Sequence, residues 1–281
     1  MSDSKPRVVL LADGTRPALS SELERLRPTV ELGCEVVGEV LDLANGQIDP
    51  TANLAIVFGG DGSILRTARL MGQNQLPVLG VNLGKLGFLA HVRPEQLDEV
   101  IPVLARYEEN VVEHLMFDCT LLRDGQPIEG RLGLNEASVL AGPPFSMIEI
   151  QLYVDANLAT TYSCDGLIVS TPVGSTAHSL SAGGPILRKN LQAFVISPIN
   201  PHTLTNRPVV DSADRVFELA VPAPNEGTSL VLDGKVWTTL RSGDRVRIAR
   251  SAATFKLLEI PGQGYYQTLR QKLGWGGQIR G

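Results

Sequence analysis

The sequence has few of the residues that mark disulfide-rich or metal-binding proteins. It contains 3 cysteines in 281 residues, and Cys34, Cys119 and Cys164 are widely spaced with no CxxC pair. This spacing argues against a disulfide framework and against a zinc site, and it fits a reducing compartment. The four histidines show no metal-ligand spacing either: His91, His114, His178 and His202.

Long apolar runs and an excess of positive charge are also absent. No stretch approaches 18 apolar residues, and the N-terminus, MSDSKPRVVLLADG, lacks the apolar core of a signal peptide. Lys and Arg number 25 against 30 Asp and Glu, a net charge of −5, so no general nucleic-acid footprint is visible. We therefore expect a cytoplasmic protein without nucleic-acid or membrane partners, in which local groups hold any bound anion.

The chain has two parts with different sequence patterns. Up to about residue 110, buried-strand patterns alternate with helical patterns. The expected strands are 7–12, 34–40, 54–58 and 77–81. Residues 20–26 are expected to start a helix with Ser20 as its cap, and further helices are expected at 64–71 and 94–107. Strands that alternate with helices are typical of a parallel sheet covered on both faces.

From Phe117 onward, turn signals separate short half-buried strand patterns, among them 216–221, 229–232 and 245–249. This pattern predicts an antiparallel, sandwich-like β domain. A helical pattern returns at 265–273 and stops at Gly274. We expect an α/β domain over 1–110, a β-sandwich domain over 111–262, and a tail over 263–281 that returns to the first domain.

The stretch FGGDGS, residues 58–63, follows a strand pattern and opens a helix pattern. Gly59, Gly60 and Gly62 permit close backbone approach, and the amides that open a helix attract phosphate. Asp61 is unexpected there, because a carboxylate repels phosphate. The simplest structural interpretation is that Asp61 caps its own helix through the amides of Ser63 or Ile64.

A second glycine loop, GVNLGKLGF, follows the next strand pattern at residues 80–88. Two such loops at the ends of parallel strands can line one crevice. Phe88 is either a core residue or a ring that stacks on a flat ligand. Lys85 and Arg66 are either surface charges or phosphate ligands.

The densest polar stretch is SCDGLIVSTPVGSTAHSLSAGGPIL, residues 163–187. It has no G-x-S-x-G elbow, so a hydrolase based on Ser175 and His178 is excluded on local grounds. Its hydroxyls suit recognition of ribose and base edges. Asn135-Glu136 interrupts an apolar strand pattern as either a bulge or a ligand clamp. Asp233-Gly234 predicts a hairpin turn.

Together these motifs resemble the NAD kinase family. FGGDGSILR, GVNLGKLGFL, LNEASV, the 163–187 block, LVLDGK and TLRQKLGWGG occur in the order of that family, over residues 54 to 275. The GGDG turn alone is shared with lipid kinases and phosphofructokinases, whereas the hydroxyl-rich block is specific. The resemblance implies an α/β domain with a β-sandwich domain, assembled into homodimers or homotetramers. It implies transfer of the γ-phosphoryl group of ATP to the adenosine ribose 2′-hydroxyl of NAD, with Mg²⁺ as the expected ion.

The resemblance also implies roles for individual residues. Asp61 accepts the proton of the hydroxyl or orients it, and the sequence leaves open whether it also binds magnesium; Gly59, Gly60, Gly62 and Ser63 form the phosphate loop. The implied NAD-binding residues are Asp61, Gly62, Arg66, Phe88, Asn135, Glu136, Ser163, Asp165, Thr176, Ala177, His178, Ser179, Leu180, Ser181, Asp233 and Lys235. Three of them depart from the common family pattern: His178 replaces tyrosine, Lys235 replaces glutamine, and Ser163 replaces a residue that is often basic.

Two rival functions follow from the same residues. A lipid or sphingoid-base kinase would need an apolar acceptor pocket, which the polar stretches of the second domain do not favour. A sensor that binds a dinucleotide without turnover would have no need of a carboxylate such as Asp61.

Overall fold

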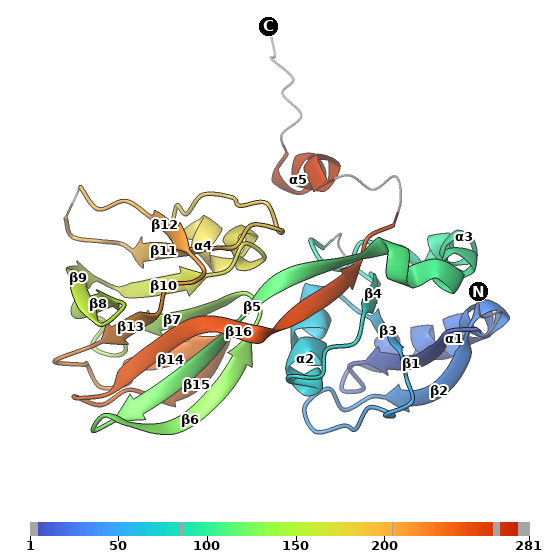
Figure 1. Cartoon of the computed structure of the whole chain (residues 1–281), viewed down its shortest axis with the longest axis horizontal. Coiled ribbons are helices and arrows are strands. Elements are labelled where there is room, and N and C mark those ends of the chain that lie inside the picture. Colours follow the sequence, from blue (N-terminus) through green and yellow to red (C-terminus); the bar gives the residue numbers. More distant parts are fainter. Residues whose placement is uncertain (1–4, 85–86, 204, 261–264, 275–281) are drawn as a thin grey trace, which may run out of the picture. The chain divides into compact units, whose positions relative to one another are not determined.

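The computed structural model describes residues 5–84, 87–203, 205–260 and 265–274. The chain forms two compact units (Figure 1): unit 1 is drawn from residues 1–113 and 255–281, and unit 2 from residues 114–254. Two long strands, β5 (Val111–Arg123) and β16 (Arg245–Leu258), each run from one unit into the other. Residues 255–260, predicted as part of the β domain, fall in unit 1, where β16 pairs with β4 at Leu257 and Val78. As domain limits, 111–262 and 263–281 stay predictions.

The sheet of unit 1 is parallel. Its order is β2-β1-β3-β4, followed by the end of β16. The four strands are β1 (Arg7–Ala12), β2 (Glu35–Val40), β3 (Leu54–Phe58) and β4 (Val78–Val81). Every residue of β3 and β4 is buried, as expected for strands with both faces covered. The predicted parallel sheet is confirmed.

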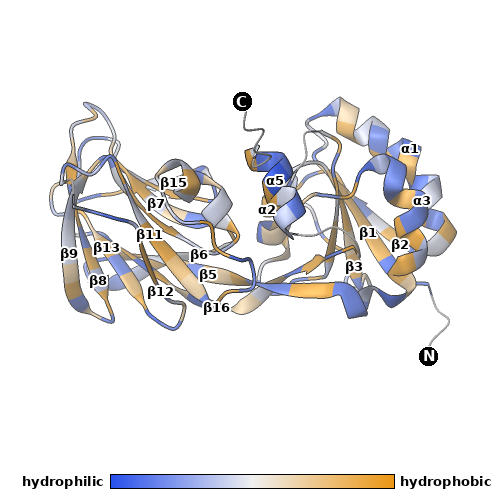
Figure 2. Cartoon of the chain, turned by 90° about the horizontal axis from the view of Figure 1, so that it is seen from above, coloured by the Kyte–Doolittle hydropathy of each residue, from blue (hydrophilic) through white to orange (hydrophobic). Residues whose placement is uncertain are grey.

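Helices cover this sheet on both faces, with α1 and α3 on one side and α2 on the other (Figures 1 and 2). Leu23, Leu26 and Val30 of α1 pack with Leu10 and Ile56 of the sheet in one apolar cluster. The helical elements are α1 (Pro17–Gly33), α2 (Asp61–Met71), η1 (Pro94–Gln96), α3 (Leu97–Val100), η2 (Ile101–Asn110) and α5 (Tyr265–Leu273).

Three helix predictions need correction. The predicted cap at Ser20 is wrong, because α1 starts at Pro17 and its N-cap is Arg16, which makes no side-chain cap bond. Pro is favoured at the first helical position, where its fixed φ suits the helix. The helix expected at 64–71 begins earlier, at Asp61. The helix expected at 94–107 is divided into η1, α3 and η2, and Arg106 has the non-helical φ of −127°.

Unit 2 is a sandwich of two sheets. One is antiparallel with the order β12-β11-β10-β7-β14-β15, and the other contains β16-β13-β8-β9 together with β5 and β6. The new strands are β6 (Gln126–Gly133), β7 (Glu136–Leu140), β8 (Ile148–Val154), β9 (Asn157–Cys164), β10 (Gly166–Ser170), β11 (Ala193–Ile199), β12 (Val209–Ser212), β13 (Phe217–Ala220), β14 (Ser229–Leu232) and β15 (Lys235–Thr239).

The core of unit 2 lies between these two sheets. Phe194 of β11 makes edge-to-face contacts with Phe117 of β5 and Phe217 of β13, at ring-centroid distances of 6.4 and 5.6 Å. Alternate residues such as Ala137 and Val139 of β7 face the same cluster. The only helical elements assigned among the described residues of unit 2 are the short η3 (Gly174–Thr176) and α4 (His178–Ser181).

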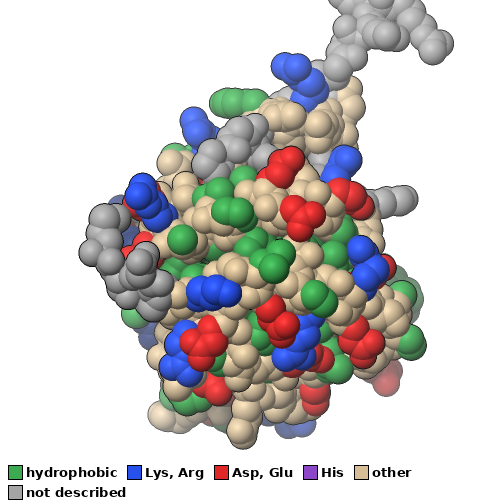
Figure 3. Space-filling model, turned by 90° about the vertical axis from the view of Figure 1, so that its right-hand side faces the viewer, with side chains coloured by type: hydrophobic (Ala, Val, Ile, Leu, Met, Phe, Trp, Pro, Cys, Tyr) green, Lys and Arg blue, Asp and Glu red, His purple; other side chains and the backbone are tan. Residues whose placement is uncertain are grey.

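Charged side chains of both signs are interspersed over the face shown in Figure 3. Exposed ion pairs of this kind include Arg25 with Glu22 and Arg27 with Glu31 on α1. Among the described residues, no helix is long and apolar enough to span a bilayer.

Candidate active site

The predicted site residues fall into two groups, one in each unit. In unit 1, the glycine turn joins β3 to α2. Gly59 has φ of +151°, and a Cβ there would lie 2.3 Å from the Ser63 Oγ, so the turn requires glycine at this position. Around Gly60 and Gly62, nothing lies within 4 Å of the place a Cβ would take. The backbone of this turn is therefore open to a ligand at both positions.

Asp61 does not cap its own helix. The Ser63 and Ile64 amides, its expected partners, donate instead to the Gly60 carbonyl at 2.9 and 3.3 Å. The Asp61 carboxylate accepts three consecutive backbone N–H groups, one at the end of the second glycine loop and two from the residues that follow it. Phe88 donates to Oδ2 at 2.8 Å, and Leu89 and Ala90 donate to Oδ1 at 2.9 and 3.0 Å. Asp61 therefore ties together the two glycine loops, as expected for loops that follow adjacent parallel strands.

Gly87 makes this contact possible. A Cβ at Gly87 would lie 2.1 Å from Asp61 Oδ1, a distance that real Cβ contacts do not show. The aromatic ring of Phe88 is half-buried, and the Lys272 Nζ of α5 lies 5.2 Å from its centroid. Lys85, the other predicted basic residue of this loop, lies outside the described residues.

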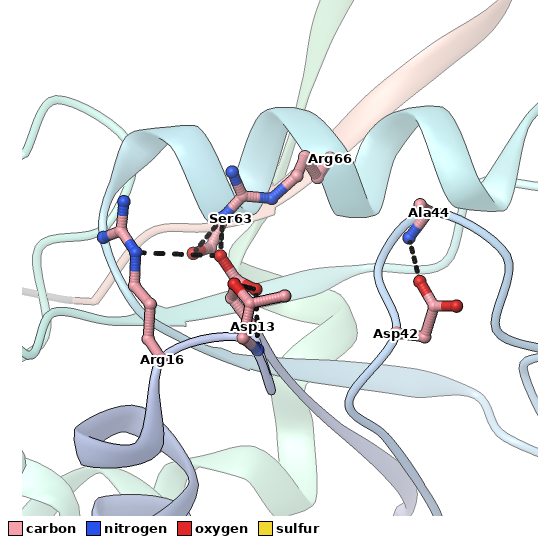
Figure 4. Close-up of polar contacts among 7 residues, drawn as sticks. Asp13, Arg16, Asp42, Ala44, Ser63 and Arg66 are labelled. Carbon is pink, nitrogen blue, oxygen red and sulfur yellow. Dashed lines mark hydrogen bonds and ion pairs between the residues drawn. The ribbon is translucent and has the colours of Figure 1, made fainter.

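Arg66 points back toward the turn from the second turn of α2 (Figure 4). Its Nη2 donates to Asp13 Oδ2 at 2.9 Å and lies 3.4 Å from the Ser63 Oγ. Asp13 follows β1, and its pKa is lowered, first by the hydrogen bond from the Thr15 hydroxyl and further by the charge of Arg66. Asp13 was not among the predicted site residues, although a carboxylate at the carboxyl end of a parallel strand is a signal that could have identified it.

In unit 2, the Asn135-Glu136 pair lies at a junction between two strands. β6 ends at Gly133 and β7 begins at Glu136, so the pair does not interrupt a single strand, as the apolar pattern had suggested. Asp233 lies beside it in the turn from β14 to β15. Asp233 and Gly234 have φ of 46° and 73°, and Leu232 pairs with Lys235, which confirms the predicted two-residue hairpin.

The Asp233 carboxylate also makes contacts that the sequence did not predict. Its carboxylate accepts the backbone N–H groups of Leu134, Asn135 and Glu136, with the shortest distance, 2.7 Å, to Asn135. Burial raises the pKa of Glu136 to about 8, and the nearby Asp233 charge adds to the rise. Asp61 and Asp233, each followed by a glycine, thus each bind three consecutive amides.

Asp165 lies at the other end of the same sheet region. β10 runs antiparallel to β7, with Gly166 opposite Leu140 and Ser170 opposite Glu136. At a rise of about 3.3 Å per residue, Asp165 and the Glu136 end are roughly 16 Å apart. The Asp165 carboxylate accepts a hydrogen bond from the Asn200 side chain at 2.9 Å. The structure therefore does not bring Asp165 next to Asn135 and Glu136.

The hydroxyl-rich segment folds into η3 and α4. Ser175 Oγ donates to the Pro172 carbonyl and accepts the Leu187 amide, so it makes no pair with His178. Ser179 Oγ lies 3.0 Å from Ser197 Oγ, which leaves it occupied inside the unit. The half-buried positions of this segment are Thr176, Ala177, His178 and Leu180, and Ser181 is exposed.

The remaining two predicted residues lie in strands. Ser163 is half-buried in β9, and its carbonyl accepts the His202 amide at 2.9 Å. Lys235 is the first residue of β15 and is exposed.

Comparisons with known proteins show which family the chain belongs to. Residues 10–109 match the model of the ATP-NAD kinase N-terminal domain, and residues 134–260 match that of the ATP-NAD kinase C-terminal domain. The NAD kinase of Rhodopirellula baltica is 53% identical over 98% of this chain and 88% of its own length. The chain belongs to the ATP-NAD kinase family. Another member, the NAD kinase of Geotalea daltonii, is 40% identical over 95% of this chain and 90% of its own length.

Two solved structures of NAD and NADH kinases share the fold. Yeast NADH kinase complexed with NADH has a TM-score of 0.85 at 20% identity, over 99% of this chain and 90% of its own. At that identity the likeness concerns the fold alone. The NAD kinase from Archaeoglobus fulgidus in complex with ATP has a TM-score of 0.71 at 26% identity, over 96% of this chain and 100% of its own. The predicted fold class and family are confirmed.

Proposed function

We propose that this protein transfers the γ-phosphoryl group of ATP to the 2′-hydroxyl of the adenosine ribose of NAD, giving NADP, and that Asp61 orients the attacking hydroxyl. The reaction is the one for which the relatives in its family are named. The observation that carries the role of Asp61 is the set of three amides around its carboxylate.

An ionised carboxylate has about four acceptor positions, two on each oxygen. Among the described residues, Asp61 Oδ1 accepts two N–H groups and Oδ2 accepts one. One acceptor position on Oδ2 is left for a substrate hydroxyl. Because the three amides fix the carboxylate, that position has a defined direction from the first turn of α2.

This arrangement suits phosphoryl transfer. The transition state is loose, so catalysis depends mainly on positioning and on electrostatic stabilisation rather than on a strong base. A carboxylate fixed by three amides aligns a hydroxyl for in-line attack. The helix N-terminus and the open backbone at Gly60 and Gly62 offer N–H groups to the phosphates.

For the dinucleotide, we propose the residues of unit 2 that have free polar groups. Asn135 and Glu136 take one part of the ligand and Asp165 takes another, because an extended dinucleotide can span the roughly 16 Å between Asp165 and the Glu136 end of the sheet. Thr176 and His178, which are half-buried, contact the ligand, and His178 and Lys235 adjust its recognition. In unit 1, we propose Phe88 and Arg66 as NAD-binding residues.

ATP enters in this proposal as its magnesium complex. Magnesium usually keeps several waters and binds through one or two carboxylates together with substrate phosphates. In the part of the chain that the structure describes, no three His, Cys, Asp or Glu side chains are grouped to hold a metal ion. We also propose a homodimer or homotetramer, the assembly that the family resemblance implies, in the cytoplasm, the compartment that the sequence predicts.

The experiment is an assay of NADP formation from ATP, magnesium and NAD, with Asp61→Asn and, as a matched control, Asp98→Asn. Asp98 is exposed in the first turn of α3, so Asp98→Asn removes the same charge from a comparable position in a helix. We expect Asp61→Asn to lose at least 100-fold in kcat, about 3 kcal/mol, and to retain NAD binding by calorimetry. Thermal melts check that the 88–90 loop still folds. Binding without turnover in the wild type would instead support a sensor, and turnover of a lipid would support a lipid kinase.

A further inference from the structure

The backbone of residues 134–136 is fully hydrogen-bonded from two sides. On one side, Asp233 accepts all three amides and its own amide donates to the Glu136 carbonyl at 2.9 Å. On the other side, Thr171 Oγ1 donates to the Leu134 carbonyl at 2.6 Å and the Thr171 amide donates to the Asn135 carbonyl at 2.9 Å. Every backbone N–H and C=O of the three residues is therefore used, and the segment is fixed.

Gly174 allows the segment that follows Thr171 to approach the backbone of residues 134–136 closely. A Cβ at this position would lie 2.2 Å from the Asn135 carbonyl oxygen, so no side chain fits there. Successive N–H groups that point at one anion form a concave anion site. Here the anion is the carboxylate of Asp233, which belongs to the protein itself. The energy of this contact holds the segment rather than a ligand.

Because the backbone groups of residues 134–136 are all used, their side chains remain available to bind a ligand. The Asn135 carboxamide, half-buried, has no hydrogen-bond partner among the described residues. The Glu136 side chain is buried, with its residue 4% exposed, and Oε2 has no partner in the described part of the protein. A buried polar group without a partner is costly, and native proteins rarely keep one without a reason.

The surroundings of Glu136 favour its neutral form. Burial raises the pKa of this carboxyl to about 8, and the Asp233 charge raises it further than burial alone. The strands on either side of β7 place Ser170 opposite Glu136 and Leu232 opposite the next residue, and neither titrates. Asp233 is the charged group in the described residues that acts on Glu136. Both effects favour the neutral, protonated form of the Glu136 carboxyl, and that form can donate a hydrogen bond to a ligand.

We infer that Asp233 is a positioning residue of the dinucleotide site, which holds Asn135 and Glu136 in place and keeps the Glu136 side chain a hydrogen-bond donor toward an acceptor oxygen of the dinucleotide. The inference rests on the proposed function and deepens it. A neutral donor suits a ligand with two phosphate charges, which a second carboxylate would repel. Asp233 acts through its neighbours and need not touch NAD itself.

The test is the pH dependence of NAD binding, measured by calorimetry without ATP from pH 6 to 9.5 in the wild type, Glu136→Gln and Asp233→Asn. The wild type is expected to bind about tenfold more weakly at pH 9 than at pH 7, because Glu136 then loses its proton. Glu136→Gln, a permanent neutral donor, is expected to bind with no such dependence. Asp233→Asn keeps an acceptor for the amides but lacks the charge, so the loss of affinity moves to lower pH.

Two results would overturn the inference: pH-independent binding in the wild type, or an unchanged pH profile in Asp233→Asn. A purely structural role for Asp233 would weaken binding equally at every pH. If Asp233→Asn does not fold, Glu136→Gln decides, since a pH dependence that persists in it contradicts the donor role. NADP formation by the wild type at pH 7 tests the proposed function separately, so the two failures are distinguishable.

Discussion

Arg66 Nη2 lies 2.9 Å from Asp13 Oδ2, an ion pair between residues 53 positions apart (Figure 4). Asp13 follows β1 and Arg66 lies on the helix after β3, and these two parallel strands are neighbours in the sheet. The pair holds the guanidinium beside Ser63 at the glycine turn. Arg66 Nε is buried and has no hydrogen-bond partner among the described residues. One side of the guanidinium is fixed, and other donors remain for a ligand.

We expect Arg66→Gln to raise the KM for NAD roughly tenfold, because a hydrogen bond to a charged group contributes about 1.5–3 kcal/mol. Asp13→Asn, which frees the guanidinium without removing it, should have a smaller effect in the same direction. Arg16→Gln is the control, since its Nε lies 3.8 Å from Asp13 and its side chain is exposed. Steady-state kinetics with NAD varied at saturating ATP measure the effect. Equal KM values in Arg66→Gln and Arg16→Gln would contradict it.

Gly87→Ala should disable the Asp61 carboxylate without changing it chemically. The new Cβ would lie 2.1 Å from Asp61 Oδ1 and would displace either the carboxylate or the loop that binds it. We expect a loss in kcat of at least tenfold. Gly84→Ala is the matched control in the same loop, because its Cβ would meet nothing nearer than the Asn82 Oδ1 at 3.9 Å. Normal turnover in Gly87→Ala would show that the position of Asp61 is not critical.

Local signals predicted much of the fold. β1, β3 and α5 have the predicted limits because an unbroken apolar run, or a helical pattern ended by glycine, identifies them without reference to the rest of the chain. Ser20 was a wrong cap because Pro17, three residues earlier, also starts a helix and does so here. Where two local signals compete, packing decides, and the sequence alone does not reveal which one prevails.

The partners of the two aspartates could not be predicted in this way. Asp61 was identified as exceptional, yet its amides come from residues 27 to 29 positions away, and those of Asp233 from 97 to 99 positions away. Turn chemistry explains why an aspartate is tolerated at each position. Only the pairing of strands brings the distant amides to it. The residue types of the site were therefore predictable and the contacts that fix them were not.

His114 should make the protein sensitive to mild acid. It is fully buried, and burial together with the charge of Lys189 lowers its pKa from 6.5 to about 4. The unfolded chain takes up the proton near pH 6.5, so this contribution to stability is complete above that pH and is lost as the pH falls toward 4. The loss amounts to about 3 kcal/mol. His114→Gln should lose less stability than the wild type between pH 7 and pH 4.5 in urea unfolding, whereas His202→Gln, an exposed control, should follow the wild type.

Asp244 is expected to be a main polar contributor to the stability of unit 2. Its side chain is 1% exposed and accepts Arg123 Nε at 2.7 Å and Nη2 at 2.8 Å, together with the Arg241 amide at 2.9 Å. Asp244→Ala leaves these donors unpaired, so we expect a loss of about 2–3 kcal/mol, somewhat below that of a fully buried pair because Arg123 is partly exposed. The midpoint of urea unfolding measures this loss.

The control for Asp244→Ala is Glu22→Ala, which removes the exposed pair with Arg25 on α1. Exposed pairs contribute little, so that variant should unfold with the wild type. The Arg123 guanidinium also lowers the pKa of Asp244. The contribution of this pair is therefore complete at neutral pH and lost as the pH falls below the ordinary value of 3.8 through the lowered one. The double variant Arg123→Met with Asp244→Ala tests the pair as a whole. If it is as stable as the wild type, the desolvation cost of burying the pair cancels the attraction between its charges.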